Sequence, residues 1–234
     1  MMAFERTKLE RSVAKVTKTT LIMKATGITA AGLVVIIAVT YIFSIFLDYS
    51  GNFTVRLASR PGSLALSTTS DFSVMTERLK ARPLSGANNI SVNDLPSDLD
   101  KYEGEHGTRN YLAFTFYLKN VGELSCTYSA QINITEVTRN VDEAIRIRVY
   151  YNGEYQDYAK PKKDNSGPEI NTVPFYSQTI AYKMLRPDFK SGEIDKFTVV
   201  MWLEGDDPDC VDELIGGVIK ADMVFNIVKR DQLV

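Results

Sequence analysis

YLAFTFYLK, at Tyr111–Lys119, is the stretch that decides the fold of this chain. Leu112, Phe114, Phe116 and Leu118 alternate in it with smaller or more polar residues. A period of two residues is that of a β-strand with one buried and one solvated face. We therefore predict a strand here, with the four apolar side chains pointing into a core.

The same pattern extends over the rest of the chain after residue 48. Alternating apolar and polar residues occur in Cys126–Ile134, Ala144–Tyr150 and Ile219–Ile227. In the second of these segments, Arg146 and Arg148 are expected to face solvent. A further segment, Phe197–Leu203, is apolar on both faces, which is typical of a central strand. Asn152-Gly153 is a hairpin turn signal. Short strands separated by turns, without a helical segment, predict an all-β sandwich of the jelly-roll or immunoglobulin-like kind.

Two polar segments interrupt this strand pattern. Arg82–Asn110 is rich in Pro, Ser, Asn and Asp, and Lys160–Pro174 contains three prolines. Such compositions favour turns and loops over regular strands. We expect both segments to be long loops between strands of the sandwich.

A different pattern precedes the strands. Ala25–Leu47 is a run of 23 residues without a charge, and a helix of that length spans the roughly 30 Å hydrocarbon core of a membrane. The run is longer than the apolar region of a cleaved signal peptide, and no A-x-A site follows it. A retained signal-anchor is therefore predicted, with a cleaved signal as the alternative. Gly27 and Ala31 form a small-xxx-small step that would let two such helices approach closely.

The charges around this span predict its orientation. The residues before it carry six basic and two acidic side chains, a net charge of +4, while the remainder is acidic. By the positive-inside rule, the N-terminus is cytoplasmic and the larger part lies outside the cell membrane. The predicted parts are a basic cytoplasmic helical segment (1–24), a transmembrane helix (25–47) and an extracytoplasmic sandwich domain (48–234). Nucleic-acid binding by the basic segment is the weaker alternative, because a membrane flank already explains its charge.

Several of these segments together resemble a known group. GNFTV at 51–55, YLAFTFYLKNVG at 111–122, DEAIRIRVYYNG at 142–153 and TVVMWLEGDDPDC at 198–210 look like exported proteins of Gram-positive bacteria. More distantly, the chain resembles the camelysin/TasA-like surface and biofilm-matrix proteins over residues 51–228. The resemblance implies a jelly-roll-like sandwich. In the fibre-forming relatives, an N-terminal strand completes a neighbouring subunit. This chain departs from them in its longer basic segment and its retained anchor.

Sequence motifs of enzymes are absent. The chain has one histidine, His106, and no H-E-x-x-H, G-x-S-x-G, Walker loop or G-x-G-x-x-G. We expect the protein not to be an enzyme. A hydrolase that uses paired carboxylates from an acidic loop is the weakest alternative.

The acidic loop follows the central strand, with six carboxylates in the ten residues Glu204–Glu213. Calcium takes about six to eight oxygen ligands, and a compact acidic loop can supply several of them. The candidate ligands are Asp206, Asp207, Asp209, Asp212 and Glu213. Their spacing is not that of an EF-hand. The favoured interpretation is structural: Glu204 and Asp206 accept hydrogen bonds from nearby backbone amides, as acidic residues do in turns.

Cys126 and Cys210 both lie in the part expected outside the cell. An oxidising compartment favours a disulfide between them. Two unbridged thiols are the equal alternative, because the sequence does not show how far apart the two Cα atoms lie.

These observations predict a non-enzymatic, membrane-anchored cell-surface protein with a structural or assembly role. A calcium-dependent adhesion or binding module is the alternative function. Asn52–Ser59, NFTVRLAS, is expected to pair as a strand, within its own sandwich or with a neighbouring copy. The expected partners are the membrane, further copies of the chain or other surface proteins. Nucleic acid is not among them, and no cofactor is expected beyond calcium.

Overall fold

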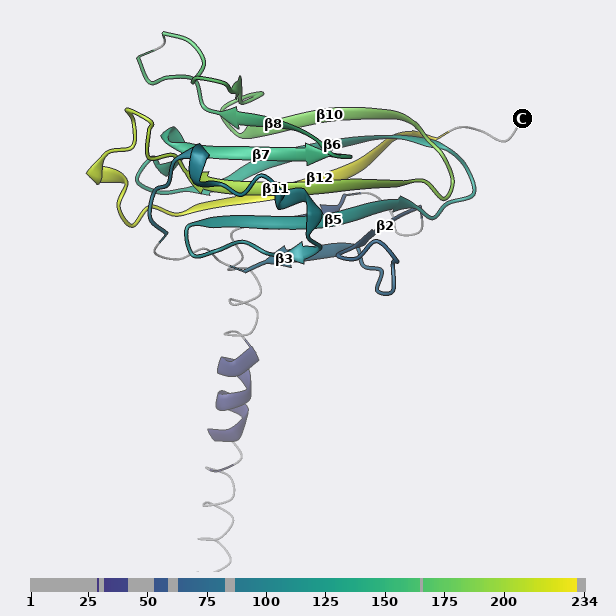
Figure 1. Cartoon of the computed structure of the whole chain (residues 1–234). Coiled ribbons are helices and arrows are strands. Elements are labelled where there is room, and N and C mark those ends of the chain that lie inside the picture. The colour runs from purple at the N-terminus through teal and green to yellow at the C-terminus, as the bar shows by residue number, and fades with distance from the viewer. Residues whose placement is uncertain are drawn as a thin grey trace, which may run out of the picture. The chain divides into compact units, whose positions relative to one another are not determined.

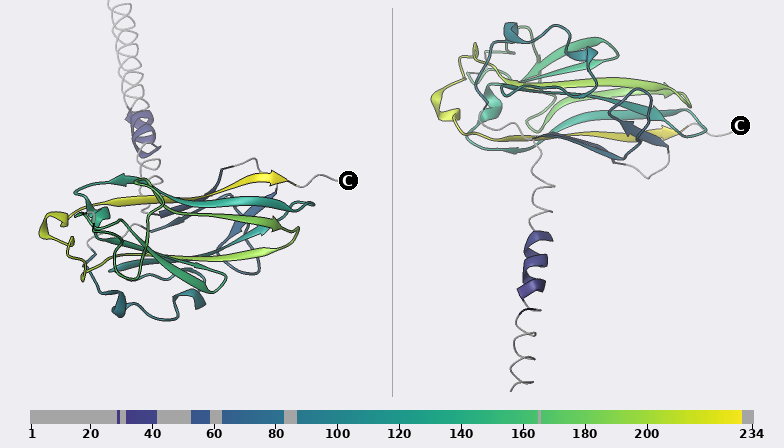
Figure 2. Two further views of the ribbon diagram at one scale, coloured as in Figure 1. Left: turned by 90° about the horizontal axis from the view of Figure 1, so that it is seen from above. Right: turned by 60° about the horizontal axis from the view of Figure 1, so that its bottom comes forward.

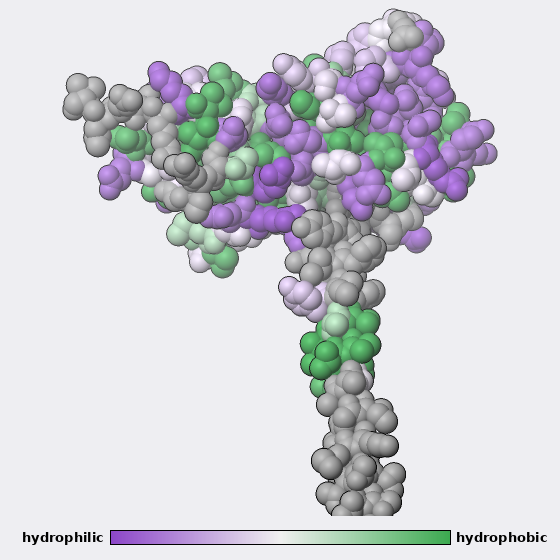
Figure 3. Space-filling model, turned by 180° about the vertical axis from the view of Figure 1, so that it is seen from behind, coloured by the Kyte–Doolittle hydropathy of each residue, from purple (hydrophilic) through white to green (hydrophobic). Residues whose placement is uncertain are grey.

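The structure is a computed structural model that describes Thr29 and residues 32–41, 53–58, 63–82, 87–164 and 166–230. The chain divides into two compact units, Met1–Ser50 and Gly51–Val234. In the first unit, residues 32–41 are helical. Their large side chains are all apolar and exposed, and they form a continuous hydrophobic surface (Figure 3). Within the described ranges, no helix is long and apolar enough to cross a membrane. Most of the predicted span 25–47, with Gly27 and Ala31, lies outside those ranges.

The second unit consists of two β-sheets packed face to face (Figures 1 and 2). The five-stranded sheet has the order β10-β6-β12-β1-β3, and the second has the order β2-β5-β11-β7-β8-β9, with β4 also paired to β5. The strands are β1 (Phe53–Leu57), β2 (Leu64–Ser67), β3 (Arg78–Ala81), β4 (Gly104–Glu105), β5 (Tyr111–Asn120), β6 (Cys126–Val137), β7 (Ile145–Tyr151), β8 (Glu154–Ala159), β9 (Val173–Pro174), β10 (Ile180–Phe189), β11 (Ile194–Leu203) and β12 (Ile219–Arg230). Short 3₁₀ helices are η1 (Val92–Asp94), η2 (Leu99–Lys101), η3 (Val141–Glu143) and η4 (Asp212–Leu214). The predicted β-sandwich is thereby confirmed.

The core lies between the two sheets, and the alternating residues of β5 point into it as predicted. Phe116 of β5 stacks on Phe197 of β11, with ring centroids 5.7 Å apart. Phe225 of β12 meets both rings edge-on, at 6.1 and 5.2 Å. Aromatic pairs in these geometries contribute about 0.5–1.5 kcal/mol beyond the area they bury. β11 pairs with β5 on one side and β7 on the other, so the predicted central position of this strand is also confirmed.

The expectation of a solvated outer face on the second sheet is wrong. Arg146 and Arg148 of β7 are only 5% and 8% exposed, and β5 is buried on both faces along almost its whole length. The reason is that the loop before β5 folds over this face. Its residues pack on a second apolar cluster that comprises Leu99, Tyr111, Ala113, Tyr150, Val200 and Trp202, with Ile90, Val92 and Leu95 against it.

β1, from the segment predicted to pair within its own sandwich or with a neighbouring copy, is internal to its own sheet. β1 pairs in parallel with β12, where Phe53 is opposite Ala221, and antiparallel with β3, where Phe53 is opposite Ala81. Both hydrogen-bonding edges of β1 are therefore occupied within the sandwich. Of the two predicted pairings, the one within the same molecule is the one that forms.

Candidate functional site

A pocket of about 700 Å³ opens on the outer face of the second sheet. Strands β7, β8 and β11 provide its floor, through residues such as Arg146, Asp157 and Trp202. Its walls come from the two long loops, at Val92 and at residues 169–172, and from residues 206–208 after β11. Ligand pockets have volumes of about 300–1,000 Å³. This pocket therefore has the size of a small-molecule site.

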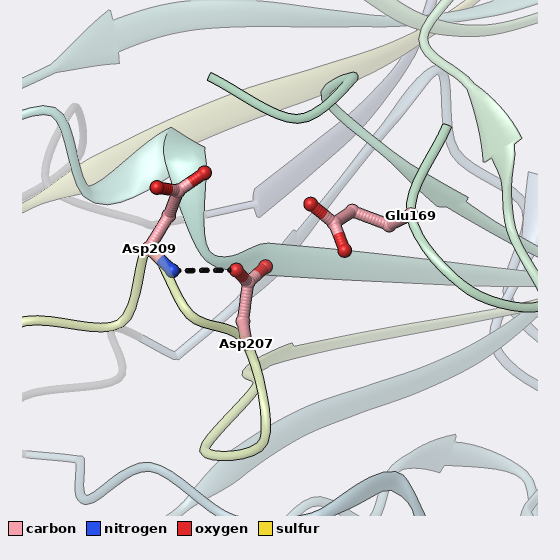
Figure 4. A group of neighbouring side chains, drawn as sticks. All are labelled: Glu169, Asp207 and Asp209. Atoms are coloured by element: carbon pink, nitrogen blue, oxygen red, sulfur yellow. Dashed lines mark hydrogen bonds between the residues drawn. The ribbon is translucent and has the colours of Figure 1, made fainter. Parts of the chain in front are cut away.

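One wall of the pocket is a buried ion cluster around Arg146. Its Nη2 atom lies 2.6 Å from Asp207 Oδ2 and 3.5 Å from Glu169 Oε2, and all three side chains are at least nine-tenths buried. The other oxygen of Asp207, Oδ1, accepts a hydrogen bond of 2.8 Å from the backbone N–H of Asp209 (Figure 4). Asp207 Oδ2 makes its ion pair without a well-aligned hydrogen bond. The cluster joins β7, the loop before β9 and the acidic loop.

The pKa of Glu169 reflects the burial of this cluster and the charges within it. Burial raises the pKa of its carboxyl above the ordinary value of 4.5, and the nearby charge of Asp207 raises it further. Arg146 and Lys162 oppose these effects without cancelling them. Burial and the neighbouring carboxylate therefore outweigh the attraction of the two cations at Glu169.

The predicted calcium ligands are brought together only in part. Asp207 and Asp209 lie with Glu169 so that one oxygen from each is within 4.8 Å of the others (Figure 4). Asp206 instead accepts a 2.6 Å hydrogen bond from the Ser91 hydroxyl, and Asp212 and Glu213 are both exposed residues of η4.

Three carboxylates are few for calcium, which takes about six to eight oxygens. The guanidinium that already pairs with Asp207 would also repel a dication placed there. The donor set therefore fits an ion-pair cluster better than a calcium site. Glu169 was missed by the sequence analysis, because it lies in a separate loop with no acidic pattern around it.

The predicted structural role of Glu204 is confirmed. Its Oε1 accepts from the backbone N–H of Asp206 at 3.2 Å, and its Oε2 accepts from the backbone N–H of Val92 at 3.1 Å. Oε2 also accepts from the indole Nε1–H of Trp202 at 2.9 Å. Glu204 thus holds the acidic loop, the loop before β5 and the floor of the pocket together. Asp206 reaches the side chain of Ser91 rather than a backbone amide.

The floor of the pocket contains a cation stacked between aromatic rings. Arg148 makes a bidentate pair with Asp157, at 2.6 and 2.9 Å. Its guanidinium carbon lies 4.3 Å from the ring centroid of Tyr155 and 5.6 Å from that of Trp202. Burial lowers the pKa of Arg148, but the hydrogen bonds and charge of Asp157 outweigh it, so the net shift is upward. Arg148 therefore stays charged and fixes the position of Tyr155.

His106 does not line the pocket. Its Nε2 and Nδ1 atoms lie 2.7 Å from the carbonyl oxygen of Leu99 and 3.0 Å from that of Gly104. The ring therefore connects η2 to β4.

No disulfide joins Cys126 and Cys210. Cys126 begins β6 and pairs with Arg230, whereas Cys210 lies in the loop before β12, whose first residue Ile219 is opposite Val137 at the other end of β6. Twelve residues of strand correspond to roughly 40 Å. The structure thus corresponds to the alternative of two unbridged thiols, because the two ends are too far apart for a bridge.

No protein-family model matches the chain, and no curated protein matches it. A solved structure described as "AvmM Catalyzes Macrocyclization in Alchivemycin A Biosynthesis" is similar over 53% of this chain and 82% of that one, at 12% identity and a TM-score of 0.25. β-Glucosidase from Kluyveromyces marxianus is similar over 74% of this chain and 19% of its own, at 13% identity and a TM-score of 0.26. The GH31 α-xylosidase from Xanthomonas citri is similar over 76% of this chain and 18% of its own, at 11% identity and a TM-score of 0.24. Likenesses this distant carry no argument about function.

Proposed function

We propose that this chain is a non-enzymatic, membrane-anchored cell-surface protein whose jelly-roll-like sandwich acts as a binding module. The observation that carries the proposal is the pocket on the outer face of the second sheet. It has the volume of a ligand site, and buried, mutually paired charges such as those of Arg146 and Asp207 hold its floor and walls in place. A site fixed in this way loses little conformational entropy when a ligand binds.

Binding is favoured over catalysis by the chemistry of the lining. No histidine, serine or cysteine is among the residues that line the pocket. Two neighbouring carboxylates of the pocket, Glu169 and Asp207, are buried against Arg146, and the side chain of Asp207 has no exposed surface. An acid or nucleophile must touch its substrate to act on it. The pair is therefore better suited to holding the wall than to hydrolysis.

Anchoring in a membrane is supported by the N-terminal pattern. The run 25–47 is uncharged, a net charge of +4 precedes it, and the described helix 32–41 is apolar around its circumference. A helix that is hydrophobic all round is stable only where apolar surroundings cover it. The proposed location is the cell membrane, with the N-terminus in the cytoplasm and the sandwich outside. The resemblance to exported Gram-positive surface proteins agrees with this location.

Assembly through strand addition is a weaker role for the sandwich. The exposed edge strand β10 contains Pro187 and two register shifts, and Asp188 beside it has a φ of 50°. At two of the other edges, β3 has four residues, two of them basic, and β9 has two residues, one of them Pro174. Short strands, prolines, bulges and charges are the features that prevent edge-to-edge pairing.

The proposal is tested by photo-crosslinking from the pocket in intact cells. A benzophenone amino acid replaces Tyr155 at the pocket mouth in the full-length chain, and Tyr176 in a control. Both tyrosines are strongly exposed and both lie over a cation, but Tyr176 does not line the pocket.

We expect an adduct with a component of the cell envelope at position 155 and none at 176. If a second copy of the chain is captured at 155, the assembly role replaces the binding role. Equal labelling at the two positions would contradict a binding pocket. Protease added outside the cells should remove the sandwich and spare the N-terminal segment, which tests the orientation.

A further inference from the structure

We infer that the ligand of the pocket is a neutral, hydroxyl-rich ring compound, that is, a sugar or a short glycan. This inference rests on the proposed binding function and adds the chemical class of the ligand. Three features of the lining support it: charges that are already compensated, an exposed aromatic ring on a rigid support, and polar groups that can still form hydrogen bonds.

The first feature concerns the charges that line the pocket. Arg146 is paired with Asp207 and Glu169, and Arg148 is held in a bidentate pair with Asp157. A phosphate or other anion needs cations that are free to bind it. Here Arg146 would have to give up buried partners and Arg148 a largely buried one, which is unfavourable. The remaining cation of the lining, Lys162, acts electrostatically on the carboxylate of Glu169 and lowers its pKa, so its charge is already partly compensated. An anionic ligand is therefore disfavoured.

A cationic ligand is disfavoured for the converse reason. The acidic residues of the pocket are engaged as well: Glu204 holds two backbone amides and an indole N–H, and Asp206 holds the hydroxyl of Ser91. The guanidinium of Arg146 lies directly against the carboxylates of the wall. A neutral ligand requires none of these pairs to open.

The second feature is the ring of Tyr155. The residue is 57% exposed at the pocket, although its ring is supported by Arg148 at 4.3 Å and by the buried Tyr150 at 5.1 Å. Large aromatic side chains supply binding area at low entropic cost when they are held rigidly. The C–H face of a sugar ring can pack on such a surface while its hydroxyls point elsewhere.

The third feature is the set of polar groups left to bind those hydroxyls. Asn171 is exposed at the pocket, in a left-handed backbone conformation with φ of 57°, and its side-chain amide makes no hydrogen bond to any described residue. Lys162 also lines the pocket; its charge acts on Glu169 without a direct ion pair between the two described side chains, so its ammonium N–H groups can still donate. An amide both donates and accepts, and an ammonium donates. A sugar hydroxyl, which does both, complements each of them.

A peptide is a poorer fit than a glycan. Peptides bind sheets mainly by adding a strand at an open edge, whereas this pocket lies on a sheet face between loops. An apolar ligand would leave the amide of Asn171 and the ammonium of Lys162 without partners when it covered them, which costs free energy. A neutral glycan is the class that satisfies both the ring and the polar groups.

The test is calorimetric titration of the full-length chain at pH 7. The neutral probes are the hexasaccharides of β-linked glucose, α-linked glucose and β-linked N-acetylglucosamine. The charged probes are inorganic phosphate, hexagalacturonate and hexalysine. We expect at least one neutral probe to bind with a Kd below about 1 mM, and more tightly than every charged probe.

Variants of the two exposed tyrosines distinguish the pocket from non-specific binding. Tyr155→Ala should weaken binding about tenfold, because it removes the aromatic surface. Tyr155→Phe should retain most of the affinity, and Tyr176→Ala should bind as the parent does. Asn171→Ala should weaken binding about fivefold through a lost hydrogen bond. Equal melting temperatures of the variants show that each is folded.

The outcomes separate this inference from the function it rests on. If a charged probe binds more tightly than all neutral ones, or if no glycan binds while position 155 still crosslinks in cells, the ligand class is wrong and the binding module stands. If neutral probes bind but Tyr155→Ala and Tyr176→Ala behave alike, binding is elsewhere and the inference fails. If nothing binds and nothing crosslinks, both proposals fail.

Discussion

Removal of Arg146 should destabilise the sandwich more than any surface ion pair does. At an effective dielectric constant of 20, its attraction is about 6 kcal/mol to Asp207 at 2.6 Å and about 5 kcal/mol to Glu169 at 3.5 Å. Most of this attraction offsets the free-energy cost of removing the three charges from water. Removing one partner of a buried pair nevertheless costs about 3–5 kcal/mol, because the other charges stay buried without compensation.

The variant is Arg146→Ala, and the assay is urea unfolding of the full-length chain at pH 7. A loss of about 4 kcal/mol corresponds to a melting temperature lower by roughly 10 °C for a chain of this size. The control is Arg56→Ala. The side chain of Arg56 is 43% exposed, and its partner Asp222 keeps a hydrogen bond from the side chain of Asn133, so the loss of Arg56 should cost only about 1 kcal/mol.

The loss of stability in Arg146→Ala should also depend on pH, and it should be smaller at low pH. The folded pKa of Glu169 is raised above its ordinary value of 4.5, so folding favours its protonated form. The stability linked to this group is fully present below that value and is lost as pH rises through the folded pKa. Without Arg146 the folded pKa rises further. The difference between Arg146→Ala and the parent should therefore shrink as the pH falls toward 4.

A triple variant with Arg146→Met, Glu169→Gln and Asp207→Asn completes the test. It removes all the charges together, and its stability should lie close to that of the parent. A loss below 1 kcal/mol in Arg146→Ala, or a loss that is the same at pH 4.5 and pH 7, would refute the buried ion cluster.

Three further predictions follow from other contacts. Tyr128→Phe removes the 2.5 Å hydrogen bond that the hydroxyl donates to the buried Asp195, and should cost about 1–3 kcal/mol in denaturant unfolding. Gly107→Ala places a Cβ 2.5 Å from a backbone oxygen and 2.7 Å from a backbone nitrogen, and should also cost about 1–3 kcal/mol in the same assay. Cys210, partly exposed, should react with a maleimide in the native protein, whereas the buried Cys126 should react only after unfolding; mass spectrometry distinguishes the two.

The sequence was sufficient to predict which strand residues face the core between the two sheets. The period of two in β5 and the two-sided apolar run in β11 report directly on burial between sheets, because a strand exposes alternate residues to each face. The outer face of the second sheet could not be predicted in this way. Arg146 and Arg148 have the pattern of solvated residues, and only the distant loops that cover them make them buried.

The candidate site, too, could be predicted from the sequence only in part. Asp207 and Asp209 drew attention as part of an acidic run, but what the run does depends on Arg146 and Glu169, which are far from it in sequence. An acidic pattern shows that carboxylates are close together, and cannot show which cation neutralises them. That depends on how the loop before β9 folds back onto β7, which is a tertiary property.

The single tryptophan of the chain offers the most direct test of the binding pocket. Trp202 is 1% exposed, lines the pocket, and donates its indole N–H to Glu204. A ligand above it should change its environment, so its fluorescence should shift during titration of the full-length chain with neutral hexasaccharides. We expect a saturable shift that is lost in Tyr155→Ala and retained in Tyr176→Ala. A fluorescence spectrum that stays constant, or changes equally in both variants, would contradict this expectation.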